Sequence, residues 1–230
     1  LPGPAASDDN ATVAEDSSVT IDVLTNDANS SGANIRKIND IAIQNGGPAI
    51  ALPHGSVLLT NSGTGSDHLI YTPAPNYFGP DSFTYTIQNT AGQFSTATVN
   101  VTVTNVNDLP TDINFAGTAV NENAAAGTVV STLTTLDPDN TAVATNDTFT
   151  YTLANNFGGA FQIVGNQIQV LNGALLDFES GVVSYALNVT VDDGHGGTFA
   201  EAVTIAVNNV NEAPTDIIFN GNAATTAVSV

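Results

Sequence analysis

The chain has 230 residues and carries 22 Asp and Glu residues against 2 Lys and Arg, which gives a formal charge of −20 at pH 7. The two cationic residues, Arg36 and Lys37, are adjacent. Binding to nucleic acid or to an anionic membrane requires basic patches, so this charge argues against both kinds of partner. Hydrophobic residues make up 42% of the chain, which argues against disorder. We expect a folded chain whose carboxylates recruit cations.

The composition favours an all-β protein. There is no Cys, so no disulfide framework holds the fold together. No run of about 18 apolar residues occurs, which argues against direct membrane insertion. Strand-forming residues are frequent, 20 Gly and 10 Pro separate them, and long stretches of helical period are missing.

In the first half of the chain, apolar and polar residues alternate as expected of half-buried strands. The clearest predicted strands there are 19–23, 83–87 and 97–103. In the second half, strands are predicted at 149–151, 161–163, 168–170, 185–191 and 203–207. Each half has about seven short strands separated by turn signals, which is typical of a β-sandwich. We predict two tandem Greek-key β-sandwich domains.

A nine-letter segment at the end of the first half returns at the end of the second. Residues 105–113, NVNDLPTDI, recur as NVNEAPTDI at 209–217, an offset of 104 residues. A self-match at this spacing indicates modules about the size of one β-sandwich. We predict a first repeat over 6–107, a second over 108–211, and the first strand of a truncated third repeat over 212–230.

Acidic clusters in the second repeat fall at the ends of predicted strands, which gather at the two poles of a sandwich. These clusters are 121–123, 137–139, 177–179, 192–194 and 211–212. Asp and Asn are also common in turns, because they hydrogen-bond their own backbone, and this explanation stays open for any single Asp. It does not explain the shortage of Lys and Arg, since two like charges about 4 Å apart repel by about 1 kcal/mol even in bulk water. Bound Ca²⁺, which prefers carboxylate, amide and carbonyl oxygens, is the simplest resolution.

Several of these acidic residues occur in a recognisable order. In the second repeat they are Glu122, Asp137-Pro138-Asp139, Asp177-Phe178-Glu179, Asp193 and the linker beginning at Asn209. This order resembles a cadherin-like repeat of giant bacterial surface adhesins and biofilm proteins. The first repeat resembles the related Ig-like tandem repeats of the same adhesins, through residues 14–16, 23–27, 53–57 and 71–85.

The resemblance implies two groups of calcium ligands. At the junction between the repeats it implies Glu15, Asp81, Asn107, Asp108, Asp137, Asp139 and Asp193. At the far pole of the second repeat it implies Glu122, Asp177, Glu179, Asn211 and Glu212. The pole at the start of the first repeat also carries Asp8, Asp9 and Asp27. Asn105 and Asn209 stand where cadherins favour Asp, and fewer charges should weaken a site.

The expected function is structural. By the resemblance, these are calcium-stabilised extender repeats of a secreted or surface-displayed adhesin, which stiffen an array and project a distal binding domain. Their partners would be neighbouring repeats of the same chain, with a cell-surface glycan or protein reached through other domains. One alternative is that a module itself binds a glycan or a protein, with residues 40–55 and Tyr77-Phe78 as the candidate patch. Another is homotypic association through module edges.

An enzymatic function is not expected. His54, His68 and His195 are isolated from one another in the sequence, and no nucleophile motif such as Gly-x-Ser-x-Gly occurs. Paired carboxylates could serve glycoside hydrolysis, but the chain has no Trp to form a sugar platform. We expect no catalytic residues.

Overall fold

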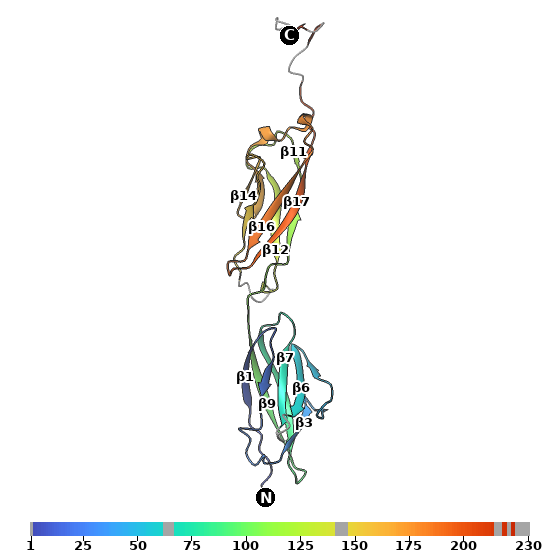
Figure 1. The fold of residues 1–230 in the computed structure, drawn as a ribbon, viewed down its shortest axis with the longest axis vertical. Helices are drawn as coiled ribbons and strands as arrows, with labels where there is room; N and C mark the ends of the chain where they lie inside the picture. The colour runs from blue at the N-terminus through green and yellow to red at the C-terminus, as the bar shows by residue number, and fades with distance from the viewer. Residues whose placement is uncertain (1, 62–66, 141–146, 214–217, 220–221, 224–230) are drawn as a thin grey trace. The chain divides into compact units, whose positions relative to one another are not determined.

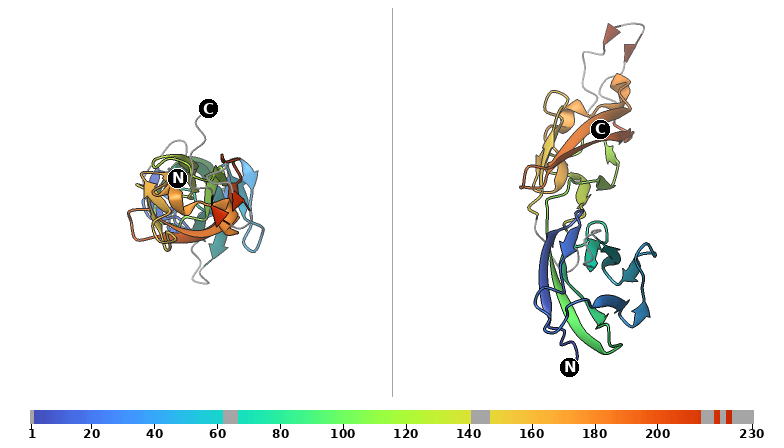
Figure 2. Two further views of the ribbon diagram at one scale, coloured as in Figure 1. Left: turned by 90° about the horizontal axis from the view of Figure 1, so that it is seen from above. Right: turned by 60° about the horizontal axis from the view of Figure 1, so that its bottom comes forward.

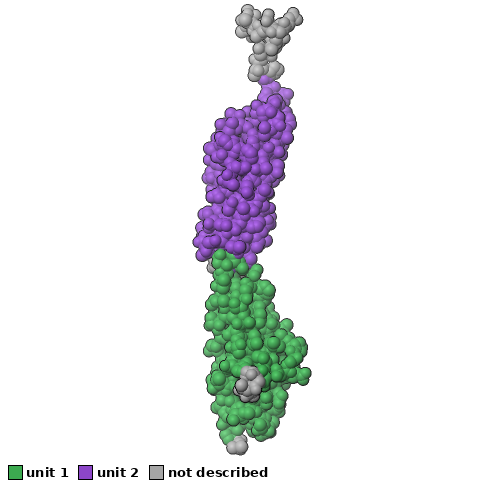
Figure 3. Space-filling model, in the orientation of Figure 1, with its two compact units in different colours: residues 1–108 green, residues 109–230 purple. Residues whose placement is uncertain are grey.

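The computed structural model describes residues 2–61, 67–140, 147–213, 218–219 and 222–223. The chain divides into two compact units, Leu1–Asp108 (unit 1) and Leu109–Val230 (unit 2), shown in separate colours in Figure 3. No helix in the described part is both long and apolar enough to cross a membrane.

Unit 1 consists of two β-sheets. The first has the order β1 (Asp9–Ala14), β9 (Phe94–Thr104), β8 (Gly79–Gln88), β3 (Asn34–Ile38), β4 (Ile41–Ala42). The second has the order β2 (Val19–Ile21), β7 (Asp67–Pro73), β6 (Gly55–Asn61), β5 (Ile50–Leu52). Figure 2 shows these strands from two further directions, coloured from blue to green along the chain.

The core of unit 1 follows from the alternation in its strands. Along β9 the side chains of Ala97, Val99, Val101 and Val103 are buried, and most of the residues between them are exposed. Because successive side chains of a strand point to opposite faces, this one strand supplies a continuous apolar row. The row packs with buried residues of both sheets, the largest of which include Tyr85. The predicted strands 83–87 and 97–103 are therefore confirmed.

Unit 2 is also a two-sheet sandwich (Figure 1). One sheet has the order β10 (Asp112–Ala116), β12 (Val129–Leu136), β15 (Gln167–Val170), β14 (Phe161–Val164). The other has the order β11 (Ala119–Asn121), β17 (Thr198–Asn208), β16 (Ser184–Asp192), β13 (Thr150–Leu153). Two short 3-10 helices, η1 (Gly173–Leu175) and η2 (Phe178–Ser180), connect β15 to β16. The predicted all-β sandwich fold is confirmed.

The two units share one topological detail. Near the start of each unit a short strand pairs in parallel with the unit's last long strand: β1 with β9, and β11 with β17. The pairing ends in the same way in both units. The amide of Glu15 donates to Thr104 O at 2.9 Å, and the amide of Glu122 donates to Asn208 O at 3.1 Å. A glutamate is thereby fixed beside the end of the last strand in each unit.

The predicted strand of a third repeat falls mostly outside the described residues. Residues 214–217 and 224–230 belong to the part that the structure leaves undescribed. Within the described part, β18 (Ile218–Phe219) pairs antiparallel with β19 (Asn222–Ala223).

A buried carboxylate links the two sheets of unit 1. Asp67, at the start of β7, is 7% exposed and accepts a hydrogen bond from the backbone amide of Ile35 in β3 at 2.9 Å. A second, longer hydrogen bond of 3.4 Å comes from the Asn61 side chain. Since β7 and β3 belong to different sheets, this bond ties the halves of the sandwich together.

We expect Asp67→Ala to destabilise unit 1 by about 2 kcal/mol, because the buried Ile35 amide would lose its acceptor. Urea unfolding should show a lower midpoint at an unchanged slope. The matched control is Asp40→Asn, at a position whose side chain is 93% exposed and pairs only loosely with Lys37 at 3.8 Å; it should change stability by less than about 0.5 kcal/mol, because Asn tolerates the positive φ of this residue as Asp does. Equal midpoints for the two variants would contradict the assigned role of Asp67.

Candidate metal centres

Unit 2 has acidic side chains but no Lys or Arg. It carries more than half of the 22 acidic residues of the chain, while both cationic residues lie in unit 1. Its one histidine is His195. Carboxylates that fold into the interior of this unit can therefore be neutralised only by His195, by protons or by bound cations.

The first group of acids in unit 2, the aspartate cluster, consists of Asp137, Asp139, Asp147 and Asp193. Asp137 follows β12, Asp193 follows β16, and Asp147 precedes β13. The pairing of β13 with β16 brings the last two together, and the Thr148 amide donates to Asp193 O at 3.0 Å. Asp137, Asp139 and Asp193 are 5%, 1% and 0% exposed, and the Asp147 side chain is 1% exposed.

Backbone amides hold part of this cluster in place. Asp137 Oδ1 accepts from the Asp139 amide at 2.9 Å, and Asp193 Oδ1 accepts from the amides of His195 and Gly197 at 2.6 and 2.9 Å. Gly197 is required here, because a Cβ at this position would lie 2.0 Å from Asp193 Oδ2. The loop after β16 thus wraps closely around one carboxylate.

Other oxygens of the cluster have no hydrogen-bond donor. Asp137 Oδ2 and both carboxylate oxygens of Asp147 are buried without a hydrogen bond, although His195 Nδ1 lies 3.3 Å from Asp147 Oδ1. Burial raises the pKa of both Asp137 and Asp147, and neighbouring aspartates of the cluster raise it further. In the absence of a cation, holding these groups ionised inside the fold therefore costs stability.

The second group, the glutamate cluster, lies where η2 and the segment after β17 meet. Glu122, Asp177 and Glu179 each offer a carboxylate oxygen, and these oxygens lie within 4.8 Å of one another. Glu122 is buried and is held from two sides: its Oε1 accepts from the Val210 amide at 2.6 Å and its Oε2 from the Phe178 amide at 2.9 Å. Three acids predicted as ligands are thus brought together.

Within the glutamate cluster, the pKa values of Glu122 and Glu179 shift in opposite directions. The two backbone amides lower the pKa of Glu122, so it stays ionised. Desolvation and the adjacent Glu122 raise the pKa of Glu179. Asp177 also caps η2, since its Oδ1 accepts from the Ser180 amide at 3.2 Å. A divalent cation beside Glu122 would favour the ionised form of Glu179.

The remaining predicted residues of this pole are less enclosed. Glu212 is exposed and its Oε1 accepts from Asn123 Nδ2 at 3.0 Å, and Asn211 is exposed. Asn209 donates from Nδ2 to Glu179 Oε1 at 2.7 Å, a contact that no spacing in the sequence predicts. Asp147 is not among the predicted ligands, because it belongs to no Asp-x-Asp or Asp-x-Glu pattern and joins its cluster only through the pairing of β13 with β16.

In unit 1, the predicted ligands are held by different partners. Glu15 is 2% exposed, and its Oε1 accepts from the Val106 amide at 2.7 Å, the counterpart of the Glu122–Val210 bond in unit 2. Asp81 Oδ2 accepts from the Tyr71 hydroxyl at 2.8 Å. Asn107 is exposed and Asp108 is half-buried. Each unit therefore uses a buried glutamate to hold the first residues after its last long strand, β9 or β17.

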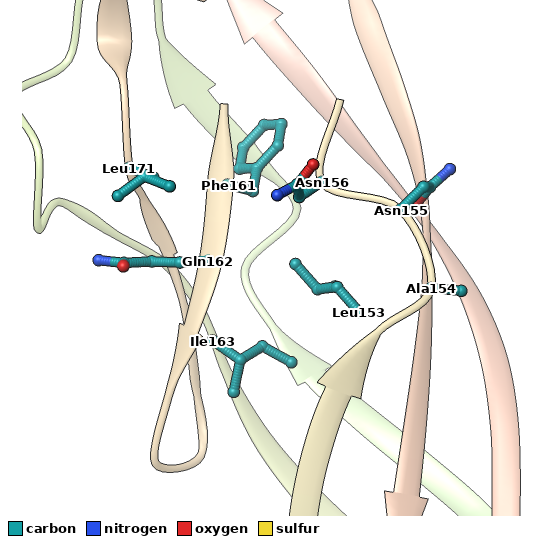
Figure 4. Close-up of a pocket in the computed structure, with 8 residues that line it drawn as sticks. All are labelled: Leu153, Ala154, Asn155, Asn156, Phe161, Gln162, Ile163 and Leu171. Atoms are coloured by element: carbon teal, nitrogen blue, oxygen red, sulfur yellow. The ribbon is translucent and has the colours of Figure 1, made fainter. Parts of the chain in front are cut away.

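A groove in unit 2 offers a different kind of surface. It has a volume of about 390 Å³ and lies at the side of the sandwich where β13 and β14 are the edge strands of the two sheets (Figure 4). Its lining consists of apolar and amide side chains: Leu153, Ala154, Asn155, Asn156, Phe161, Gln162, Ile163 and Leu171. With no titratable group among them, the lining provides no acid, base or nucleophile.

The patch proposed for unit 1 contains one aromatic stack. The His54 and Tyr77 rings lie 4.2 Å apart with an interplanar angle of 8°. Tyr77 packs partly against the core and donates from its hydroxyl to Pro80 O at 2.5 Å. The Tyr77 ring is therefore held by His54, by the core and by Pro80, as expected of a structural residue.

Comparisons with known proteins agree with this fold. Residues 2–102 match the model of a family described as bacterial Ig domain. No curated protein matches the chain significantly in sequence. The structure is similar to protocadherin gamma B2 extracellular cadherin domains 3-6 (TM-score 0.59, 15% identity, 92% of this chain and 48% of that one). It is also similar to protocadherin gamma C5 EC1-3 (TM-score 0.58, 17% identity, 89% and 67%) and to human CDH23 EC21-23 (TM-score 0.55, 20% identity, 88% and 67%).

These similarities establish the fold of the repeats. The chain spans about half, 51%, of protocadherin gamma B7 extracellular cadherin domains 1-4, at 16% identity. At such identities the likeness concerns architecture alone. The expected resemblance to Ig-like and cadherin-like repeats is confirmed, and the bacterial adhesin setting stays a prediction.

The raised pKa of Asp147 gives a test of its environment. In calcium-free solution at pH 7, Asp147→Asn should raise the melting temperature by about 4 °C, because it removes a desolvated charge. An acid whose pKa is raised in the folded state contributes stability below its unfolded pKa, near 3.8, and loses it as pH rises through the folded value. The advantage of the variant should therefore shrink as pH falls from 7 to 4.

Thermal melts in chelator across that pH range provide the measurement, with Asp40→Asn as the exposed control. A variant less stable than the wild type at pH 7 would show that Asp147 is stabilised as an ion by its present neighbours.

Proposed function

We propose that the chain is a pair of calcium-stabilised structural repeats of a secreted or surface-displayed adhesin. One observation carries the proposal: Asp137 Oδ2 and Asp147 Oδ2 are buried without hydrogen-bond donors in a unit that has no Lys or Arg and whose one histidine, His195, lies beside the other oxygen of Asp147. The Ig-like and cadherin-like folds fit an extracellular structural or adhesive role. The adhesin setting and the bound calcium are not implied by the fold and belong to the proposal.

Calcium is the cation that suits these donors. Both clusters offer carboxylate oxygens, with amide and backbone oxygens nearby, and calcium takes about six to eight such ligands in flexible geometry. The chain has no Cys, and unit 2 has a single His, so the sulfur and nitrogen donors that zinc prefers are scarce. In the aspartate cluster the ligands would be Asp137, Asp139, Asp147 and Asp193. In the glutamate cluster they would be Glu122, Asp177, Glu179, Asn211 and Glu212.

The role of the linker is proposed from the sequence. Asn107 and Asp108 follow β9 and precede unit 2 in the chain, and their side chains offer oxygen ligands. With Glu15 and Asp81 they would join the aspartate cluster in binding calcium. Neutralising these carboxylates together would convert a flexible connection into a stiff one, so that the array holds a distal binding domain away from the surface. The proposal includes no catalysis.

The groove beside β13 and β14 favours a second candidate, in which unit 2 itself binds a glycan or a protein. Its amide side chains, Asn155, Asn156 and Gln162, can both donate and accept hydrogen bonds, as sugar hydroxyls require (Figure 4). A glycan array probed with the chain in the presence of calcium tests this candidate. Binding that is lost in Gln162→Ala would support it, and an array without binding would exclude the glycans tested.

We expect calcium to raise the melting temperature by on the order of 10 °C at a concentration 100-fold above its Kd, since binding to the folded state alone adds about 2.7 kcal/mol per site. The aspartate cluster and the glutamate cluster should each contribute to this shift. Asp139→Asn should lose most of the contribution of the aspartate cluster, whereas the exposed control Asp40→Asn should show the full shift.

Small-angle scattering on the same samples measures the mechanical effect. Calcium should give a larger and better defined maximum dimension than chelator does. If neither the maximum dimension nor the melting temperature responds to calcium, the proposed function is wrong.

A further inference from the structure

Unit 1 has a groove of its own, which we call the amide groove. Three segments form it: the start of the chain, the connection from β2 to β3, and the turn from β8 to β9. Its volume is about 510 Å³, which falls in the range of about 300 to 1,000 Å³ that is typical of small-molecule sites.

Every polar side chain that lines the amide groove is neutral. Three are amides, Asn29, Asn89 and Gln93, and two are hydroxyls, Ser31 and Thr90. The chain has 22 Asp and Glu residues, and none of those that the structure describes lines this groove. Amide and hydroxyl side chains can both donate and accept hydrogen bonds. The groove therefore suits an uncharged ligand that offers donors and acceptors together.

The three segments are fixed to one another before any ligand binds. The Ala5 amide donates to Ala28 O at 2.8 Å, and the Ala28 amide donates to Ala5 O at 2.9 Å. A Cβ at Gly32 would lie 3.5 Å from Thr90 Cγ2, so the β2–β3 connection touches the β8–β9 turn. Because these segments already hold their positions, a ligand would not have to order them on binding.

Two of the amides lie against the same glycine. Asn29 Nδ2 donates to Gly3 O at 3.3 Å, and a Cβ at Gly3 would lie 3.6 Å from Gln93 Nε2. Asn89 holds Gln93 in place, since its Nδ2 donates to Gln93 Oε1 at 3.0 Å and its Oδ1 accepts from the Gln93 backbone amide at 2.9 Å. Among the described residues, Gln93 Nε2 then has no acceptor and Asn29 Oδ1 has no donor. One fixed donor and one fixed acceptor are left for a ligand.

We propose that the amide groove binds a neutral glycan, with Gln93 Nε2 donating to one sugar hydroxyl and Asn29 Oδ1 accepting from another. Sugar hydroxyls both donate and accept, as these two atoms require, and the hydroxyls of Ser31 and Thr90 add partners that can rotate. Pro2 and Ala91 also line the groove and would contact the C–H groups of the ring.

Charge and lining narrow the class of ligand. The formal charge of −20 repels anions, which disfavours sialylated, sulfated and uronate-containing glycans. A peptide ligand usually depends on a large apolar or aromatic side chain that fills a pocket. The apolar residues of this lining, Pro2 and Ala91, are too small to form such a pocket. A neutral sugar is therefore the ligand that matches.

A glycan array probed with the full chain provides the first test. The detection tag is placed after the last residue, because Pro2 lines the groove. A few neutral hydrogen bonds support a single-site Kd on the order of 1 mM, so multivalent display is needed to detect binding. Neutral glycans should bind and acidic ones should not. The signal should persist in chelator below the melting temperature, because no carboxylate lines the groove.

Gln93→Glu tests the assigned donor. A glutamate oxygen can still accept from Asn89, but the N–H groups that face the ligand are lost, so affinity for the glycan found on the array should fall by about tenfold. The control Gln44→Glu makes the same change of charge at an exposed position of unit 1 outside the groove, and its affinity should stay at the wild-type value. NMR titration with the free sugar gives the Kd values and should shift the side-chain amide signals of Asn29 and Gln93 in the wild type.

Asn29→Gly provides a second variant should Gln93→Glu fold poorly. Asn29 has φ 55°, which glycine adopts without strain, and removal of its Oδ1 should also weaken binding by about tenfold. Melting temperatures of both variants check that unit 1 remains folded. Equal affinities for Gln93→Glu, Asn29→Gly and Gln44→Glu would overturn the proposal, as would an array on which no neutral glycan binds.

The site goes beyond the proposed function and does not rest on it. Binding that is lost in Gln162→Ala but kept in Gln93→Glu would assign the glycan to the groove of unit 2 and overturn the site in unit 1. A melting temperature that ignores calcium, together with glycan binding lost in Gln93→Glu, would reject only the calcium-stabilised role. A melting temperature that responds to calcium on a chain that binds no neutral glycan would reject only the amide groove.

Discussion

The structure depends on how a chain with almost no cations satisfies the carboxylates that it buries. Some are satisfied by backbone amides: Glu122 receives two, and Asp193 receives two from the loop that closes around it. Such bonds keep a carboxylate ionised without a cationic side chain. Others, including oxygens of Asp137, Asp147 and Asp27, receive no hydrogen bond on at least one side. Backbone amides therefore satisfy some of the buried carboxylates, and the carboxylate oxygens that receive no hydrogen bond lie at the ends of the sandwiches.

The glutamate near the start of each unit shows how the repeat is preserved in structure while its sequence diverges. Glu15 and Glu122 each end a parallel strand pairing and accept from the amide of a valine after the last strand, Val106 or Val210. The two valines are related by the 104-residue offset of the sequence repeat. Because the glutamate is buried and the amide is otherwise without a strand partner, the bond fixes where the chain leaves each sandwich. A linker that starts from a fixed point is a condition for any stiff array.

The sequence predicted the strands, which depend on local alternation, but it did not predict contacts that depend on pairing between distant segments. Strands such as β9 and β17 follow from period-two burial, and the all-β sandwich follows from their number and spacing. The sequence also grouped Glu122, Asp177 and Glu179, whose oxygens the structure brings within 4.8 Å. Asp147 could not be found in this way, since only the register of β13 against β16 brings it beside Asp193. The Tyr85 hydroxyl of β8 lies within 3.3 Å of Ser7 O, Val23 O and Asp27 Oδ1, which come from two other segments that no spacing rule connects to it.

The apolar cores stabilise the fold of each unit, whereas the buried acids lie where they can affect the stiffness of the connections. Each unit has its own apolar core, and the buried carboxylates without donors lie at the ends of the strands rather than between the sheets. A core of this kind folds by burial of apolar surface, so the sandwiches should persist without metal, although less stably. Desolvated acids at the poles add a cost that only a cation or a proton removes, and they add it where the chain enters and leaves each sandwich. A divalent ion would therefore act mainly on the connections, which are the parts that decide whether tandem domains move independently or together.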